Sequence, residues 1–265
     1  MSRRLRLDAE LVRRGLARSR DQAADLIAAG RVAVGGQPAL KAASQVGLDA
    51  AITVQQASEE PEYVSRGGHK LAGALAAFDR LEVAGKRCLD AGASTGGFTD
   101  VLLRAGAAHV VAVDVGYGQL AWSLQTDNRV TVLDRVNVRT LTPDQVAPAP
   151  DLVVADLSFI SLTLALPALV GSASPAADFV LMVKPQFEVG RDHVGDGVVR
   201  DPALRAAAVM SVATAAERLG LGVAGITASP LPGPSGNVEY FLWLRRGAEP
   251  LDKKKLRIAI ETGPQ

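Results

Sequence analysis

Four charged residues of the sequence are predicted to gather at one edge of a parallel sheet. Asp156 and Lys184 each follow directly after an apolar run of strand length. Glu239 directly precedes such a run, so it reaches the same edge if that strand runs antiparallel, and Lys70 comes just before the first helix of the same region. Two lysines and two acids at one edge are costly unless they pair or meet a ligand. We therefore predict a functional site there, with a surface salt-bridge network as the alternative.

A strand–turn–helix pattern at residues 87–104 lies beside these charges. A short apolar run leads through Asp90 into a glycine-rich turn, and a helical pattern follows. The glycines let the backbone approach a ligand closely, and the start of the helix offers free N–H groups. Further on, a second apolar run ends in Asp114, whose carboxylate can accept hydrogen bonds from both hydroxyls of a ribose. The pattern thus predicts a site for a ligand that contains a nucleoside.

The glycine spacing discriminates between nucleoside ligands. The dinucleotide fingerprint fails because Ser94 stands where a second glycine must admit a pyrophosphate. An acid two residues before Gly92, with the pair Gly96 and Gly97 placed late, resembles instead the first motif of S-adenosylmethionine-dependent methyltransferases. That cofactor has a ribose and an amino-acid tail but no phosphate. The residues predicted to contact it are Asp90, Gly92, Ala93, Ser94, Thr95, Gly96, Gly97, Phe98, Asp114 and Asp134.

Two other interpretations of the same turn remain open. It could merely pack a helix on a sheet. Residues 92–96 also match G-x-S-x-G, the nucleophile elbow of serine hydrolases. Such hydrolases place several strands before the elbow, whereas here the sheet begins with it, and His193 precedes at least two more predicted strands. The hydrolase interpretation is therefore the weaker one.

Composition limits the class of protein. At 265 residues the chain has room for one α/β domain and a smaller unit. The net charge is only +1, so any binding of nucleic acid must depend on local patches. Cys88 is the single cysteine, which suits a reducing compartment, and neither an apolar signal core nor a membrane-spanning window is found. We predict a cytoplasmic protein without a metal site, because His109 and His193 lack ligand partners at metal spacing.

The order of elements predicts the fold. Strands are expected at 88–89, 110–113, 130–133, 151–156, 178–183, 223–227 and 240–244, with helices at 71–78, 98–104 and 202–219. Alternating strands and helices predict an open α/β sheet, mostly parallel, with helices on both faces. Residues 186–201 are glycine-rich and charged, which favours a long loop over an active site or partner. Trp122 is expected to pack in the core, with a place in the cofactor pocket as the alternative. The basic stretch 253–257 is expected to form a solvated face, with RNA contact as the alternative.

The first part of the chain forms a unit of its own. Residues 1–57 carry a helix that starts at Leu5, a second helix that ends at Gly30, and short strands at 31–34 and 52–54. Between residues 1 and 31 there are eight arginines against four acids. We place an acidic, proline-bearing linker at 58–65 and the larger domain at 66–265.

This basic unit resembles the S-four-type RNA-binding domain through the pattern R-L-D-x-x-L-V-x-x-G-x-x-x-S-R-x-x-A-x-x-L-I. The resemblance implies that arginines are laid against folded RNA. Few aromatic residues accompany them, so the unit is expected to read RNA shape and backbone. The alternative is that the arginines only solvate two helices. The residues predicted to contact RNA are Arg4, Arg6, Arg18, Arg20 and, in the larger domain, Arg66.

Five further motifs follow in order: S-R-G-G-H-K-L, D-x-G-A-S-T-G-G-F-T-D, D-L-S-F-I-S-L, V-K-P-Q-F-E and G-N-V-E-Y-F. Together they resemble the TlyA (hemolysin A) family, whose catalytic domain belongs with the FtsJ-like ribose 2′-O-methyltransferases. The resemblance implies a Rossmann-like class I methyltransferase sheet of seven strands with an antiparallel last strand. It also implies an S-adenosylmethionine cofactor and methylation of cytidine 2′-hydroxyls in the ribosomal RNA of both subunits. A Lys-Asp-Lys-Glu catalytic tetrad would fall on Lys70, Asp156, Lys184 and Glu239.

The role of Lys184 within that tetrad stays open at this stage. A neutral lysine could remove the proton of the ribose hydroxyl, and a charged one could stabilise the forming alkoxide. Two other classes of function also remain, a pore-forming hemolysin and a ribosome-binding protein without activity. No amphipathic hairpin or apolar span supports the first, and the intact acids and lysine argue against the second.

Overall fold

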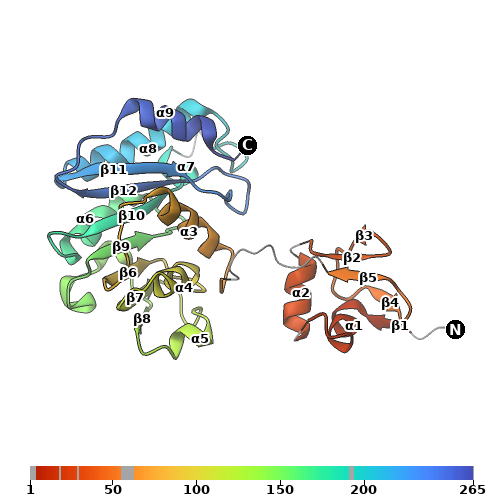
Figure 1. Cartoon of the computed structure of the whole chain (residues 1–265). Coiled ribbons are helices and arrows are strands. Elements are labelled where there is room, and N and C mark those ends of the chain that lie inside the picture. The colour runs from red at the N-terminus through yellow and green to blue at the C-terminus, as the bar shows by residue number, and fades with distance from the viewer. Residues whose placement is uncertain (1–3, 18, 29, 55–62, 191–193, 265) are drawn as a thin grey trace. The chain divides into compact units, whose positions relative to one another are not determined.

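The larger unit is built on a seven-stranded sheet in the order β11–β12–β10–β9–β6–β7–β8 (Figure 1). The strands are β6 (Arg87–Ala91), β7 (His109–Asp114), β8 (Val130–Asp134), β9 (Leu152–Ala155), β10 (Asp178–Val183), β11 (Leu221–Ala228) and β12 (Tyr240–Arg246). From β10 to β8 all neighbours run parallel, whereas β12 runs antiparallel to β10 and to β11. The predicted α/β sheet with its antiparallel last strand is confirmed.

Two compact units divide the chain, one of residues 1–62 and one of residues 63–265. Among the residues that the structure describes, none of the helices is long and apolar enough to cross a bilayer. The computed structural model describes residues 4–17, 19–28, 30–54, 63–190 and 194–264.

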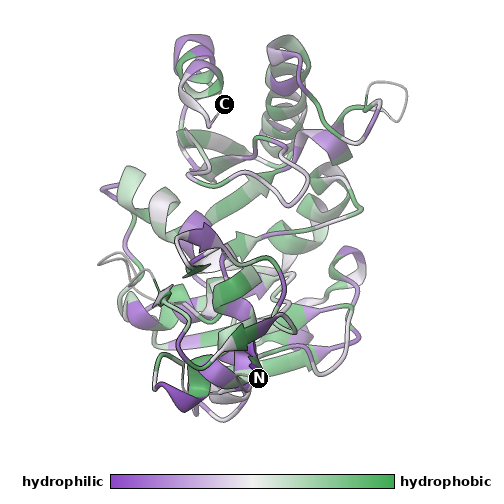
Figure 2. Cartoon of the chain, turned by 90° about the vertical axis from the view of Figure 1, so that its right-hand side faces the viewer, coloured by the Kyte–Doolittle hydropathy of each residue, from purple (hydrophilic) through white to green (hydrophobic). Residues whose placement is uncertain are grey.

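Alternation along the strands gives the sheet two apolar faces. Leu89 and Cys88 are both fully buried, but they belong to different core clusters because successive side chains point to opposite faces. The helices α3 (Gly67–Ala77) and α4 (Gly97–Arg104) contribute to the cluster of Cys88, whereas α6 (Leu162–Ser172), α8 (Pro202–Glu217) and α9 (Lys253–Thr262) contribute to that of Leu89. Figure 2 shows the strands of the sheet coloured largely as hydrophobic. Burial on both faces explains their near-continuous apolar runs.

Three local expectations about the larger unit are wrong. Lys70 lies in the first turn of α3 and not before the helix. The predicted loop begins with a short helix, α7 (Pro185–Glu188), because Pro185 suits the first helical position. Trp122 opens the short helix α5 (Trp122–Gln125) and is 75% exposed, so it does not pack in the core.

The smaller unit combines two helices with short strand pairs. Its elements are β1 (Arg4–Arg6), α1 (Leu7–Arg13), α2 (Arg20–Ala28), β2 (Val32–Val34), β3 (Gln37–Pro38), β4 (Gln45–Gly47) and β5 (Ile52–Val54). The first helix starts at Leu7, since residues 4–6 pair antiparallel with β4 instead of joining the helix. Leu7 and Leu11 of α1 pack with Ile27 of α2 and Val32 of β2. The sequence predicted β2 and β5 but not β1, β3 and β4, whose two or three residues show no clear alternation.

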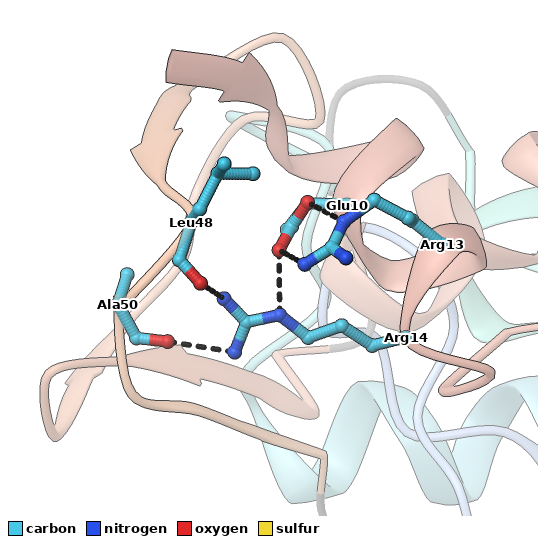
Figure 3. Close-up of polar contacts among 5 residues, drawn as sticks. All are labelled: Glu10, Arg13, Arg14, Leu48 and Ala50. Carbon is cyan, nitrogen blue, oxygen red and sulfur yellow. Dashed lines mark hydrogen bonds and ion pairs between the residues drawn. The ribbon is translucent and has the colours of Figure 1, made fainter. Parts of the chain in front are cut away.

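Two arginines of the basic unit serve its fold (Figure 3). The buried carboxylate of Glu10 accepts hydrogen bonds from Arg13 (2.7 and 2.6 Å) and from Arg14 Nε (2.6 Å). Arg14 also donates to the carbonyl oxygens of Leu48 (2.9 Å) and Ala50 (2.7 Å). These contacts connect α1 to the turn before β5, and the hydrogen bonds from Arg13 lower the pKa of Glu10 to about 2.

We predict that Glu10→Gln loosens α1 at neutral pH and speeds amide hydrogen exchange there. A lowered pKa means that the ionised carboxylate stabilises the fold, and this contribution is lost as the pH falls from 4.5 towards 2. The difference in exchange between wild type and variant should therefore shrink over that range. Equal exchange of α1 in both proteins at pH 7 would contradict the role given to Glu10.

Candidate functional site

The register of the sheet brings the predicted site residues to one edge. Ala155 of β9 pairs with Ala91 of β6 and with Leu181 of β10, so the carboxyl ends of these parallel strands lie together. Val183 pairs with Tyr240, which places Lys184 opposite Glu239 at the next position of the antiparallel pair. Directly opposed residues of neighbouring strands share a face of the sheet.

Two ion pairs form at this edge, one buried and one with a partly exposed carboxylate. Lys184 Nζ lies 2.5 Å from Asp156 Oδ1, and Lys70 Nζ lies 2.5 Å from Glu239 Oε2. The exposed fractions of Lys184, Lys70 and Glu239 are 8%, 5% and 1%. Buried charges are tolerated when each has a partner, and two lysines with two carboxylates leave the cluster without net charge. The four side chains therefore form a paired, largely buried cluster at this edge, which differs from a salt-bridge network on the surface.

Glycines let α3 approach the start of α4 and so deliver Lys70. A Cβ on Gly97 would lie 2.3 Å from Ser65 Oγ and 2.8 Å from the backbone nitrogen of Gly68. A Cβ on Gly68 would lie 2.6 Å from the side chain of Tyr63. Distances this short exclude side chains at both positions. The motif S-R-G-G-H-K thus contributes in two ways: its glycines allow the close packing of α3 on α4, and its lysine is Lys70 of the cluster.

The turn after β6 is held by Asp114. Its Oδ2 accepts a hydrogen bond from the backbone N–H of Ser94 (2.8 Å), and its Oδ1 accepts one from Gly116 (2.7 Å). Gly92 adopts φ = +85°, and a Cβ there would lie 2.7 Å from the carbonyl oxygen of Asp156. Each carboxylate oxygen keeps a further lone pair for a ligand. The turn, Asp114 and Asp156 thus lie around one space.

That space is a cavity of about 700 Å³. Of the residues predicted to contact the cofactor, Gly92, Ser94 and Asp114 line it, as does Asp156 of the predicted tetrad. Lys184 reaches its wall through Asp156 and through Ser158, whose Oγ accepts a hydrogen bond from Lys184 Nζ at 2.9 Å. The volume is typical of sites that hold a small molecule or cofactor.

Other predicted cofactor residues do not line the cavity. Asp90 is fully buried and accepts a hydrogen bond from Thr99 Oγ1 (2.7 Å), and burial raises its pKa to about 7. Phe98 packs against Phe241 in the core. Asp134 accepts a hydrogen bond from the N–H of Gly118 (2.9 Å) and so steadies the loop after β7. Ala93, Thr95, Gly96 and Gly97 form the turn and the start of α4 without lining the cavity.

Several lining residues were not predicted from the sequence. They are Val115, Gln119, Val136, Asn137, Val138, Arg139, Leu157, Ser158, Phe159, Ile160, Ser161 and Leu164. Most follow soon after Asp114, Asp134 or Asp156, which end or follow parallel strands. That position, at the carboxyl ends of the strands, is the signal that could have found them.

The predicted RNA contacts are distributed over both units. Arg6 and Arg20 meet at Asp8, which accepts hydrogen bonds from Arg6 Nη2 (2.8 Å) and Arg20 Nη2 (3.0 Å). The pKa of Asp8 is lowered, and the hydrogen bond from Arg6 is the main cause. The two side chains remain 46% and 58% exposed. Arg4 is exposed, Arg66 is exposed and donates to the carbonyl oxygen of Pro232 (3.0 Å), and Arg18 lies outside the described residues.

The histidines and Cys88 are the side chains that could bind a metal ion or act as a thiol. No group of three or more His, Cys, Asp or Glu residues there could hold a metal ion. His109 interacts with Thr131 Oγ1 at 2.9 Å, and His193 lies outside the description. Burial raises the pKa of the Cys88 thiol to about 12, as expected for a small apolar residue of a strand.

Comparisons with known proteins agree with this geometry. A family model described as FtsJ-like methyltransferase matches residues 63–246, and a model described as S4 domain matches residues 5–52. A Mycobacterium tuberculosis protein named 16S/23S rRNA (cytidine-2'-O)-methyltransferase TlyA is 66% identical over 246 residues, which cover 92% of this chain and 91% of the relative. Hemolysin A of Brachyspira hyodysenteriae is 37% identical over 239 residues, 89% of this chain and 98% of that protein. A solved structure from Streptococcus thermophilus, whose name refers to hemolysin, has a TM-score of 0.77 at 36% identity and covers 98% of this chain and 96% of its own.

We predict that Asp90→Asn stabilises the protein at about pH 8, by on the order of 2–4 kcal/mol. The pKa of Asp90 is raised from 3.8 to about 7 in the fold, so the neutral form is favoured and ionisation at higher pH costs stability. Asparagine avoids that cost, and its advantage should disappear as the pH falls from 7 to 4. Thermal melting across this range measures the effect, with the exposed Asp144→Asn as control. An advantage of Asp90→Asn that is independent of pH would contradict the prediction.

Proposed function

Because the chain belongs to the FtsJ-like methyltransferase family, we propose that it transfers a methyl group from S-adenosylmethionine to the ribose 2′-hydroxyl of cytidine in ribosomal RNA. The observation that carries the proposal is the ion pair of the buried Lys184 with Asp156, beside a cavity that the glycine turn and Asp114 help to line. The substrate class is inferred from the name of the Mycobacterium tuberculosis relative, which refers to both ribosomal subunits. Such a substrate implies work in the cytoplasm.

The cavity fits the proposed cofactor. Asp114 would bind the ribose hydroxyls through the lone pairs that its backbone contacts leave free. Val115 and Asn137, which line the cavity after β7 and β8, would lie near the adenine, and Gly92 would admit the amino-acid tail. Ser94 lies where a pyrophosphate would need a glycine, consistent with a ligand without phosphate. When bound, the cofactor supplies an electrophilic methyl group.

Lys184 would act on the hydroxyl that receives the methyl group. A ribose hydroxyl is a weak nucleophile, so catalysis requires alignment and help with its proton. Asp156 and Ser158 hold Lys184 Nζ at the wall of the cavity. From there a neutral amine could accept the proton, and an ammonium could stabilise the developing alkoxide. Lys70 and Glu239 would complete the tetrad by balancing the charge and fixing the orientation of the cluster.

RNA recognition is assigned to both units. We assign residues 1–57 to RNA binding, 58–65 to a linker and 66–265 to methyl transfer. Arg6 and Arg20 would contact phosphates, because Asp8 orients their guanidinium groups while leaving half of each side chain exposed. In the larger unit Phe159 is 91% exposed and lines the cavity, which suits stacking on a base drawn out of the RNA.

We predict that Lys184→Ala lowers the rate of methyl transfer by about 10²–10⁴-fold. Transfer from labelled S-adenosylmethionine into ribosomal RNA measures the rate, and calorimetry should give an unchanged affinity for the cofactor. The matched control is Lys255→Ala, which removes an exposed lysine of α9. Near wild-type transfer by Lys184→Ala would remove this lysine from the mechanism.

We predict that the double variant Arg6→Ala, Arg20→Ala weakens RNA binding and lowers the slope of log affinity against log salt by about 2. The reason is the loss of two phosphate contacts and of the counterions they release. The matched control is the double replacement by lysine, which keeps the charge and should keep the slope. An unchanged slope in the alanine variant would contradict the phosphate contacts.

A further inference from the structure

Ser158 contacts the same nitrogen that the proposed mechanism uses. It lies two residues after Asp156, in the segment between β9 and α6, and its side chain is exposed to the cavity. Its Oγ accepts a hydrogen bond from Lys184 Nζ at 2.9 Å, while Asp156 Oδ1 lies 2.5 Å from that nitrogen. Lys184 Nζ therefore has one hydrogen-bond acceptor, Ser158 Oγ, and one ion-pair partner, Asp156 Oδ1.

We propose that Ser158 is a positioning residue that aims Lys184 Nζ at the substrate hydroxyl; this inference rests on the proposed function. A neutral amine has two N–H groups and one lone pair. The hydrogen bond to Ser158 fixes one N–H group, and the ion pair with Asp156 holds the nitrogen beside the carboxylate, so the lone pair has a defined direction. In the ammonium form the third N–H takes that same direction. The serine thus serves the lysine whether it acts as a base or as a charge stabiliser.

The segment that carries the serine is fixed by the helix that follows Lys184. Glu188 of α7 accepts hydrogen bonds from Ser161 Oγ (2.5 Å) and from the backbone N–H of Leu162 (2.8 Å), at the start of α6. The short helix α7 begins directly after Lys184. The carboxylate therefore holds the two sides of the contact at a constant separation.

An aromatic contact fixes the same segment from its outer side. Phe159 adopts φ = +64°, a conformation that costs a non-glycine residue energy unless its surroundings impose it. Its ring lies 5.3 Å from that of Phe187, also in α7. The strained residue directly follows the serine, which indicates that the backbone is held there to place the serine hydroxyl.

We expect Ser158→Ala to lower kcat by about threefold to tenfold, because the amine can then turn among its staggered positions. The KM for RNA and the affinity for S-adenosylmethionine should stay unchanged, since neither depends on the direction of the lysine nitrogen. Ser158→Thr keeps the hydroxyl oxygen and should restore most of kcat. Equal loss in the alanine and threonine variants, together with a raised KM, would overturn the inference in favour of a packing role.

The matched control is Ser123→Ala, which removes an exposed hydroxyl of α5 outside the cavity lining. This variant should leave kcat and KM unchanged. A wild-type kcat in Ser158→Ala overturns the inference and leaves the proposed function intact. Absence of methyl transfer by the wild type, with S-adenosylmethionine and ribosomal RNA supplied, overturns the proposed function and the inference with it.

Discussion

The burial of two lysines at the edge of the sheet constrains the rest of the larger unit. A lysine nitrogen that is less than a tenth exposed needs a polar partner, and each of the two lysines has a carboxylate oxygen at 2.5 Å. Replacement of both pairs by apolar side chains would satisfy packing equally well. Their presence is therefore better explained by chemistry than by stability, and the cavity beside them agrees with that explanation.

The fold supplies the four residues from four separate elements. Parallel register brings the ends of β9 and β10 together, the antiparallel β12 returns Glu239 to the same edge, and glycine contacts let α3 place Lys70 above it. A parallel sheet offers its strand ends as a common edge, whereas the antiparallel strand adds its starting residue to that edge. The last strand thus has a role in the site as well as in the sheet.

The sequence predicted the elements and the charged cluster because both follow from simple patterns. A lysine directly after the apolar run 179–183 can only lie at a strand end. The sequence did not predict contacts that depend on the direction of side chains in three dimensions. Asp90 was predicted to contact the cofactor, whereas its carboxylate accepts a hydrogen bond from Thr99 in the core. Ser158 and Phe159 belong to the motif D-L-S-F-I-S-L, but the motif does not predict their contacts with Lys184 and Phe187, which come much later in the chain.

The most direct test of the central claim is a map of 2′-O-methyl groups in ribosomal RNA at nucleotide resolution. The RNA would come from cells that carry the wild-type protein, the Lys184→Ala variant or no copy. The account predicts methylated cytidines that are present only with the wild type. An identical map in all three would contradict it.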